Sequence, residues 1–407
     1  MMVTSADKRR KSERMPPTIF ISAGEASGEH YGALLIAALK KRLAAAGRSA
    51  EFFGMGGARM EAAGLERVVR AEEIAVMGLT EVLLHLPRIY GEFRKLKAAI
   101  RARRPAVAVL IDFPSFHFKL AEALRREGIP VVFFVSPQLW AWKKGRIRQV
   151  RKYIDKMLVI FPFEEAFYRE RGVEAEFVGH PLAELPLTPV PRAEFAAENE
   201  LDPAKAWIGL LPGSRIKEIR DHLPEMLRAA RGLAGSFQFL IPLALTLNAA
   251  QRTEVEQLVQ VNGGGLAVHL VEDARAALYH ARASVVASGT ATVEAALIGN
   301  PFVVVYRVSA LTFAIAKRLV KVSHVAMANL IAGKRVVPEL IQHDFTAENI
   351  VQQIAPLLAD GPPRQSMMEE LAKIRALLHI GRAGESGAID RVAEVTLETL
   401  GAKVSQV

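Results

Sequence analysis

The stretch AVAVLIDFP at residues 106–114 decides the fold class. A near-continuous apolar run of this length is typical of a parallel strand that is buried on both faces. Runs of the same kind precede and follow it, and helical segments separate them, among them one from about residue 24 to Ala46 and one at 118–127. The chain's first half therefore predicts a parallel sheet with further strands at 18–24, 51–57, 130–137, 156–163 and 175–181.

The same alternation restarts in the second half, after a segment in which prolines recur at 181, 186, 189 and 191. Here we expect strands at 206–214, 237–244, 266–272, 283–290 and 301–307. The sequence thus predicts an α/β protein of two Rossmann-like, doubly wound domains that face a central cleft. The expected divisions are a basic tail (1–17), an N-terminal domain (18–185), a C-terminal domain (186–380) and an amphipathic C-terminal helix (381–407) that packs back toward the domain junction.

Composition excludes several classes of protein. The 407 residues are 51% hydrophobic and 24% charged, which indicates a globular chain. The absence of cysteine excludes a disulfide scaffold, a Cys–zinc site and a thiol nucleophile, and it suits a reducing cytosol. The net charge is +10, and most of it lies outside the tail. Such a surplus suits an anionic small molecule, an anionic membrane surface or nucleic acid, although no nucleic-acid motif is present.

The glycine-rich segment SAGEASGEHYG at 22–32 joins the first predicted strand to a helix. Its glycines, at 24, 28 and 32, have neither the spacing of a dinucleotide fingerprint nor the lysine of a P-loop. One interpretation is a plain strand-to-helix turn in which Gly24 relaxes the backbone and Gly28 and Gly32 allow close helix packing. The other is a ligand-binding loop, which the polar side chains beside Glu25 favour.

Two loops of the second half are typical of phosphate binding. In LLPGSRIKEIR (210–220), Gly213 and Ser214 turn into a helix N-terminus, and Arg215 adds a fork of donors. In VVASGTATVE (285–294), Gly289 and Thr290 open a helix, and Glu294 follows one turn later, where it could accept hydrogen bonds from ribose hydroxyls. Together the loops indicate a nucleotide diphosphate. The alternatives are ordinary helix caps and an acidic side chain that complements the helix dipole.

Asp112 ends the buried strand at 106–114. If it faces the cleft, it can take a proton from a hydroxyl nucleophile; otherwise it caps the next helix. No Asp-x-Asp occurs in the chain, so the usual metal motif of sugar-nucleotide enzymes is missing, and the histidines have no metal-ligand spacing. Arg215 and helix N-termini would then stabilise a leaving diphosphate.

Two segments suggest a surface contact. The stretch 75–105 has a helical apolar stripe in its first half and a basic second half, which favours either core packing or contact with acyl chains or a bilayer. The stretch 136–156 places Trp140 and Trp142 beside seven basic residues, as an interfacial anchor, a glycan platform or a plain junction. His180, at the end of a predicted strand, is interpreted as structural. No stretch is long and apolar enough for a spanning helix, and the tail lacks the apolar core of a secretory signal.

Nine segments, in this order, resemble the lipid-A-disaccharide synthase family. They are SAGEASGEHYG, AVMGLTEVL, IDFPSF, SPQLWAW, FPFE, FVGHP, LLPGSR, SGTATVE and NLIAGKRVVPEL, and they cover about residues 18–400. The resemblance implies a GT-B glycosyltransferase that is inverting and independent of metal or other cofactors. It would join UDP-2,3-diacylglucosamine to 2,3-diacylglucosamine 1-phosphate, giving the β(1→6) disaccharide 1-phosphate and UDP. It would act as a peripheral protein on the anionic cytosolic face of the inner membrane of Gram-negative bacteria, with a homodimer left open.

The resemblance also implies roles for particular residues. Gly24 and Gly28 would let the backbone approach the acceptor sugar, Glu25 would orient a hydroxyl or the developing charge, and Asp112 would be the general base. The donor would bind to residues of the second half: Gly213, Ser214, Arg215, Gly289, Thr290, Glu294 and Asn329.

The chain departs from the family at Ser115 and His117, where Asp and Asn are usual, and at Glu29, where Asp is common. The first two departures put contacts with the acceptor in question. The competing enzyme interpretation is another GT-B protein that uses UDP-N-acetylglucosamine, such as a peptidoglycan-precursor transferase or a 2-epimerase. The non-enzymatic one is a basic protein that binds membranes or nucleic acid.

Overall fold

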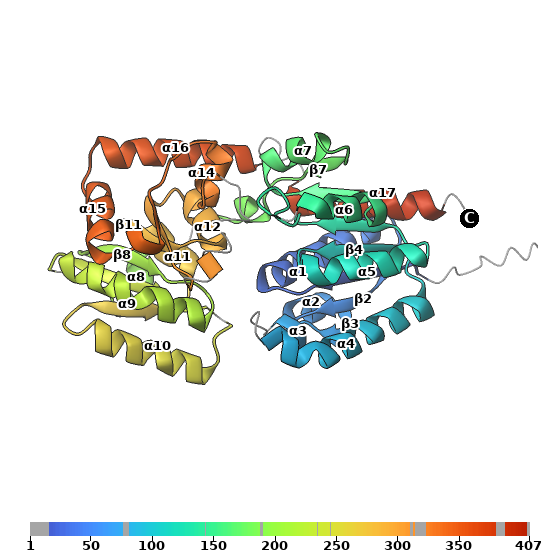
Figure 1. Ribbon diagram of the computed structural model, residues 1–407, viewed down its shortest axis with the longest axis horizontal. Helices are drawn as coiled ribbons and strands as arrows, with labels where there is room; N and C mark the ends of the chain where they lie inside the picture. Colours follow the sequence, from blue (N-terminus) through green and yellow to red (C-terminus); the bar gives the residue numbers. More distant parts are fainter. Residues whose placement is uncertain are drawn as a thin grey trace, which may run out of the picture.

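Two parallel β-sheets, one in each half of the chain, organise the molecule (Figure 1). The computed structural model describes residues 16–75, 81–142, 144–187, 190–233, 235–244, 246–309, 312–313, 323–379 and 387–404. Most of the predicted tail, part of the apolar stripe at 75–105 and residues 314–320 after the strand at 301–307 lie outside this range.

The first sheet has seven parallel strands in the order β3-β2-β1-β4-β5-β6-β7. Their bounds are β1 Thr18–Ala23, β2 Glu51–Gly56, β3 Leu65–Arg70, β4 Val107–Ile111, β5 Val131–Phe134, β6 Lys156–Val159 and β7 Ala175–Phe177. All five residues of β4 are buried, as expected of a central strand covered on both faces. The helices of this half are α1 Ala26–Ala45, α2 Ala58–Ala63, α3 Glu72–Ala75, α4 Glu81–Arg103, α5 Pro114–Arg126, α6 Ile147–Tyr153 and α7 Pro162–Arg169.

The second sheet has six parallel strands in the order β10-β9-β8-β11-β12-β13. Their bounds are β8 Ala206–Leu211, β9 Phe237–Pro242, β10 Val268–Val271, β11 Ala283–Ala287, β12 Phe302–Tyr306 and β13 Glu339–Ile341. The helices are α8 Arg192–Glu198, α9 Ile216–Gly232, α10 Ala249–Asn262, α11 Ala274–His280, α12 Thr290–Ile298, α14 Met327–Ala332, α15 Ala347–Leu358 and α16 Pro362–Leu378. The predicted fold class is confirmed. The sequence missed only edge strands in the sheets, β3 and β13.

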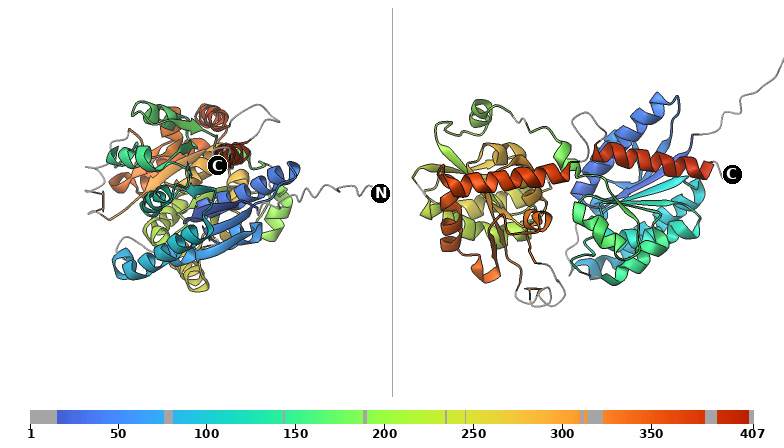
Figure 2. Two further views of the ribbon diagram at one scale, coloured as in Figure 1. Left: turned by 90° about the vertical axis from the view of Figure 1, so that its right-hand side faces the viewer. Right: turned by 90° about the horizontal axis from the view of Figure 1, so that it is seen from above.

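The last helix, α17 (Ala388–Val404), lies on the first half of the chain. Arg42 of α1 forms ion pairs with Asp390 and Glu394 at 3.3 and 2.8 Å. Figure 2 shows α16 over the second half and α17 over the first, along the same side of the molecule. The chain therefore returns to its first half after completing the second sheet, while the division at residues 185 and 186 stays a prediction.

Each sheet has one point where the order of its strands reverses. In the first sheet β1 lies beside β4, with Ala23 opposite Ile111. In the second sheet β8 lies beside β11, with Leu211 opposite Val286. Since ligands of open α/β sheets bind beyond the carboxyl ends of strands at such reversals, these two points position the candidate site.

Candidate active site

The loop after β1 packs closely against the loop after β4. A Cβ added at Gly24 would lie 2.4 Å from the Phe113 ring, so a glycine is required there for close approach and not for a positive φ. A Cβ at Gly28 would lie 3.5 Å from the Ile111 carbonyl oxygen, which is an ordinary contact. Close packing therefore requires a glycine at position 24 and not at position 28, and the proposed contact of both glycines with a sugar stays a proposal.

Asp112 stands in a strained turn. Asp112 and Phe113 both have φ of 51°, in the left-handed region that costs a non-glycine residue about 1–3 kcal/mol. The backbone N–H of Asp112 donates to the Phe134 carbonyl at 2.9 Å, which ties the turn to the end of β5. Such strain persists only where the surroundings hold it, and it concentrates at functional sites.

His117 supports this turn through hydrogen bonds of its ring. Its Nδ1 lies 2.6 Å from the Asp112 carbonyl oxygen, and its Nε2 lies 2.8 Å from the Ser22 hydroxyl. Because a carbonyl only accepts, Nδ1 carries the hydrogen, and Ser22 donates to Nε2. The ring is fully buried, and burial lowers the pKa of His117 to about 4. The imidazole is therefore neutral, and both of its nitrogens are hydrogen-bonded within the protein. In this structure His117 has no nitrogen left to contact the acceptor sugar.

The pKa of the Asp112 carboxyl is raised toward neutral pH. Burial, together with the smaller effect of the negative charge of Glu25, raises its pKa to about 7, although a hydrogen bond from the Phe113 backbone opposes the shift. A general base works best when its pKa is near the working pH. The structure places Glu25 and Asp112 near each other at the first reversal point, while Ser115 lies exposed on α5; the catalytic roles of the two carboxyl groups stay predictions.

In the loop after β8, the backbone N–H groups that could bind an anion already donate to an acidic side chain of the protein. The carboxylate of Glu218 accepts hydrogen bonds from the backbone N–H groups of Ser214 and Arg215 at 3.2 and 3.4 Å. Gly213 has φ of 119°, and a Cβ there would lie 2.5 Å from the same carboxylate. The phosphate cradle that the sequence predicts stays a prediction, and in this structure an anion would have to displace Glu218 from the two N–H groups. The Arg215 side chain is 74% exposed and available to a ligand.

His222 of α9 fixes the preceding part of this loop. Its Nδ1–H donates to the Pro212 carbonyl at 2.7 Å, and the Arg307 backbone N–H donates to its Nε2 at 3.0 Å. This buried ring ties the end of β8 to the end of β12. Nothing in the sequence distinguishes His222 from other helical histidines, so it was not predicted.

The loop after β11 brings Glu294 to the second reversal point. Gly289 and Thr290 are exposed, and Gly289 has φ 156° and ψ −161°, a conformation that is essentially confined to glycine. Arg275 Nη1 lies 3.8 Å from Glu294 and is buried without a hydrogen-bond partner among the described residues. Burial raises the pKa of Glu294 and Arg275 opposes the shift. Arg275 was not predicted, since it lies on a different helix, α11.

Asn329 is a structural residue here. Its amide group is fully buried; Nδ2 donates to the Val337 carbonyl and to Glu339, and Oδ1 accepts from the backbone N–H groups of Val336 and Val337, all within 2.7–2.9 Å. The hydrogen-bonding capacity of the amide is therefore used. In this structure the side chain holds the loop before β13, and the expected contact of Asn329 with donor phosphate or sugar stays a prediction.

The two tryptophans of the segment 136–156 have different surroundings. Trp140 Nε1 donates to the buried Glu164 at 3.2 Å, and its ring packs edge-on against Phe163. Burial raises the pKa of Glu164 to about 8. Trp140 is thus a packing residue, while Trp142 is exposed. His180 is buried and accepts from the Leu182 backbone, which agrees with its structural interpretation.

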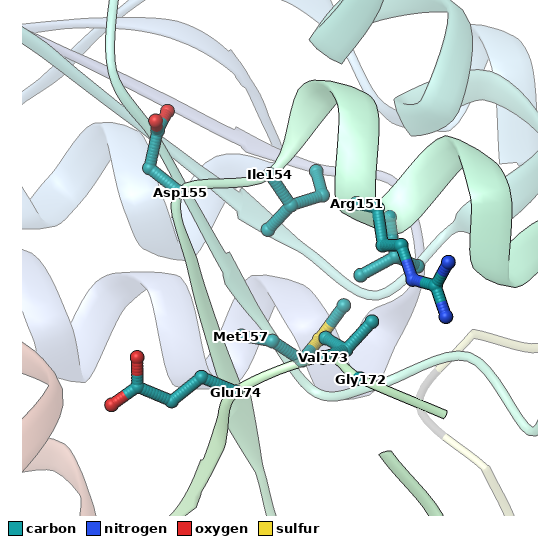
Figure 3. Close-up of a pocket in the computed structure, with 8 residues that line it drawn as sticks. Arg151, Ile154, Asp155, Met157, Gly172, Val173 and Glu174 are labelled. Atoms are coloured by element: carbon teal, nitrogen blue, oxygen red, sulfur yellow. The ribbon is translucent and has the colours of Figure 1, made fainter. Parts of the chain in front are cut away.

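A pocket of about 350 Å³ lies elsewhere, at the amino ends of β6 and β7 (Figure 3). Its lining includes Arg151, Asp155 and Glu174. Arg151 is bonded to the Arg171 carbonyl and Asp155 to Arg125, so their polar groups are engaged. This pocket is at the edge of the sheet opposite to the candidate site and has no part in it.

Comparison with known proteins identifies the family. The family model described as lipid-A-disaccharide synthetase matches residues 19–389. The chain belongs to the lipid-A-disaccharide synthase family. A lipid-A-disaccharide synthase of Acidobacterium capsulatum is 60% identical, over 94% of this chain and 96% of that protein. One of Koribacter versatilis is 52% identical, over 93% and 97%.

Solved structures share this fold at low sequence identity. A UDP-GlcNAc 2-epimerase from Neisseria meningitidis, bound to UDP-GlcNAc, has a TM-score of 0.61 at 14% identity, over 94% of this chain and all of that one. MurG of Acinetobacter baumannii has a TM-score of 0.52 at 14% identity, over 94% and 100%. At such identities the likeness concerns the fold, which is that of the GT-B glycosyltransferases.

Proposed function

We propose that this protein joins UDP-2,3-diacylglucosamine to 2,3-diacylglucosamine 1-phosphate, releasing UDP and the β(1→6) disaccharide 1-phosphate. The observation that carries the proposal is the nearly full-length match to lipid-A-disaccharide synthases at up to 60% identity among the relatives named above. The pairing of a tuned carboxyl in one half with two nucleotide-type loops in the other supports it.

Asp112 is the proposed general base. It takes the proton of the acceptor 6-hydroxyl as that oxygen bonds to the anomeric carbon of the donor, and the bond from that carbon to the UDP oxygen breaks with its electron pair leaving on UDP. This single displacement inverts the configuration at the anomeric carbon. A carboxyl with a pKa of about 7 is suited to the transfer near neutral pH. Glu25 lies beside it and orients a hydroxyl or the developing charge, and Gly24 and Gly28 keep the backbone close to the sugar.

The UDP group is proposed to bind at the second reversal point. Arg215 and the backbone of Gly213 and Ser214 hold the diphosphate after Glu218 moves aside, and the charge that develops on the leaving group is stabilised there. Gly289, Thr290 and Glu294 complete the nucleotide site. Glu294 is held near Arg275, which directs a carboxylate toward hydroxyl groups of the nucleotide.

A peripheral contact with an anionic membrane is part of the proposal. Leu86 and Tyr90 of α4 are 49% and 63% exposed, one turn apart on the same face, and Arg94 continues that face as an exposed cation. Among the described residues, no helix combines the length and apolar character needed to cross a bilayer. Co-sedimentation with anionic vesicles, lost when neutral lipids replace anionic ones or when salt is added, is the expected result. Retention by RNA instead of vesicles contradicts it.

The reaction itself is tested by mixing the purified protein with both lipids in detergent and EDTA, and following products by mass spectrometry. Disaccharide 1-phosphate formed in EDTA supports the reaction and its independence of metal. Donor hydrolysis or epimerisation without disaccharide overturns the proposal in favour of another UDP-sugar enzyme. Disaccharide that forms only after Mg²⁺ is added contradicts metal independence alone.

A further inference from the structure

Arg275 has a buried nitrogen without a hydrogen-bond partner, beside a carboxylate of the proposed nucleotide site. The residue lies in the first turn of α11, where its backbone N–H donates to the Asp273 carboxylate at 2.9 Å. This helix packs against α12, which carries Glu294 (Figure 1). Among the described residues, Arg275 Nη1 is buried and makes no hydrogen bond. Such a nitrogen needs an explanation, because an unsatisfied buried donor destabilises the folded protein.

The guanidinium of Arg275 is held by its other terminal nitrogen. Nη2 donates to the Pro186 carbonyl at 3.3 Å, in the segment that joins the two halves of the chain. Because the guanidinium is planar and rigid, the position of Nη2 also limits the position of Nη1. The contact with Pro186 therefore keeps Nη1 near Glu294, with 3.8 Å between Nη1 and Oε1.

The distance between Arg275 and Glu294 fits a bridging oxygen. A direct hydrogen bond from nitrogen to oxygen spans about 2.7–3.2 Å, so at 3.8 Å the two groups form an ion pair without one. An oxygen about 2.9 Å from both atoms could accept from Nη1, and a hydroxyl oxygen could also donate to the carboxylate. The two side chains are 24% and 21% exposed, so a ligand can reach the pair. Nη1 itself is shielded, but the carboxylate can turn about its last bond at little cost to admit the oxygen.

The proposed function, on which this inference rests, supplies such a hydroxyl. Glu294 is the residue proposed to bind the nucleotide, and the ribose of UDP carries two neighbouring hydroxyl groups. We infer that Arg275 is a substrate-binding residue whose Nη1 donates to the same ribose hydroxyl that donates to Glu294. Arg275 and Glu294 thus recognise the hydroxyl as acceptor and as donor. A ligand without that hydroxyl leaves both groups unsatisfied and binds weakly.

The test compares the affinities for UDP and for 2′,3′-dideoxy-UDP, which lacks both ribose hydroxyls, by calorimetry. Wild type, Arg275→Gln and a control, Arg228→Gln, are measured in this way, together with their thermal unfolding midpoints. Arg228 is a matched control because it pairs with the buried Glu225 at 3.2 Å, toward the C-terminal end of α9 and away from the second reversal point. The ratio of the two affinities cancels the general effect of removing a positive charge, which weakens both ligands alike.

We expect the wild type to bind UDP about a hundredfold more tightly than the dideoxy compound, and this ratio to fall about tenfold in Arg275→Gln. Arg228→Gln should keep the wild-type ratio. A ratio in Arg275→Gln within twofold of the wild type overturns the inference, because Arg275 would then act only through its charge or its contact with Pro186. Equal affinities of the wild type for both ligands also overturn it.

A second variant covers the case in which Arg275→Gln does not fold. Arg275→Lys keeps the charge but lacks the planar fork, so it cannot hold Pro186 and the ribose hydroxyl together, and its ratio should also fall. An unchanged ratio in a folded Arg275→Lys protein overturns the inference. Failure of the proposed function is distinct, since the wild type would then make no disaccharide while its two affinities could still be compared.

Discussion

Replacing Asp112 by Asn should abolish most turnover and leave UDP binding intact. General-base catalysis contributes about 10²- to 10⁴-fold, and the amide cannot take the proton. Asn has nearly the same shape as Asp and tolerates the left-handed conformation that residue 112 adopts at φ 51°. The turn, its contact with His117 and the nucleotide loops of the second half should therefore persist in the variant.

The same change should stabilise the folded protein above neutral pH. The pKa of Asp112 rises from 3.8 in the unfolded chain to about 7 when folded, so the folded state binds the proton more tightly. Stability that is present below about pH 4 is then lost progressively as the pH rises toward 7. At 1.36 kcal/mol per pKa unit the loss reaches about 4 kcal/mol, an order-of-magnitude upper value. Asn does not ionise and avoids this loss.

Turnover from product formation and the free energy of unfolding from urea titration, at pH 5 and pH 8, measure both effects. Asp155→Asn, at the opposite edge of the sheet, is the control for turnover. For the wild type, kcat/KM should rise about tenfold per pH unit below 7 and level off above it. An Asp112→Asn enzyme with turnover within threefold of the wild type refutes the assignment. Loss of turnover together with a fall in stability at pH 8 refutes the electrostatic reasoning.

Three other substitutions probe the site and its support. Gly24→Ala places a methyl 2.4 Å from the Phe113 ring and should cost about 1–3 kcal/mol in urea unfolding, whereas Gly28→Ala, with its nearest atoms at 3.5 Å, should cost much less; equal losses contradict the packing argument. Glu218→Gln should strengthen UDP binding several-fold in calorimetry, because a neutral amide competes less strongly than the carboxylate for the Ser214 and Arg215 N–H groups. Weaker UDP binding would contradict the displacement of Glu218 by the diphosphate. Glu164→Gln should match the wild type at pH 4 and be more stable at pH 9, because the pKa of Glu164 rises from 4.5 in the unfolded chain to about 8 in the folded one, so the wild type loses stability between these values; equal stabilities at pH 9 contradict this.

The sequence located the candidate site because strand ends at a reversal point carry small and polar residues. Glu25, Asp112, Arg215 and Glu294 were found in this way, from patterns within single loops. The edge strands β3 and β13 were missed because one is mixed in polarity and the other has only three residues. Arg275 was missed because its position beside Glu294 depends on the packing of two helices, which no local pattern encodes.

The surroundings of Asn329 and of the Gly213–Ser214 turn could not be predicted from the sequence, for a different reason. A polar residue in a segment shared with a family suggests a ligand contact, but four hydrogen bonds within the chain use all of the Asn329 amide. A glycine–serine turn at a helix N-terminus suggests an open anion site, but the helix supplies its own anion three residues after Arg215. In both cases the sequence pattern does not reveal the hydrogen-bond partner within the chain, because that partner depends on the positions of side chains in three dimensions.

The departure at residue 117 explains how the proposed base can be held without the usual residue. The carbonyl of a left-handed residue needs a donor, and an asparagine amide at this position could supply one. Here His117 supplies Nδ1–H to the Asp112 carbonyl, and Ser22 fixes the tautomer by donating to Nε2. A hydrogen-bond donor to the Asp112 carbonyl is therefore present at this position in this chain. Since the ring is buried and neutral at physiological pH, the substitution changes how the turn is supported and leaves the carboxyl of Asp112 free for chemistry.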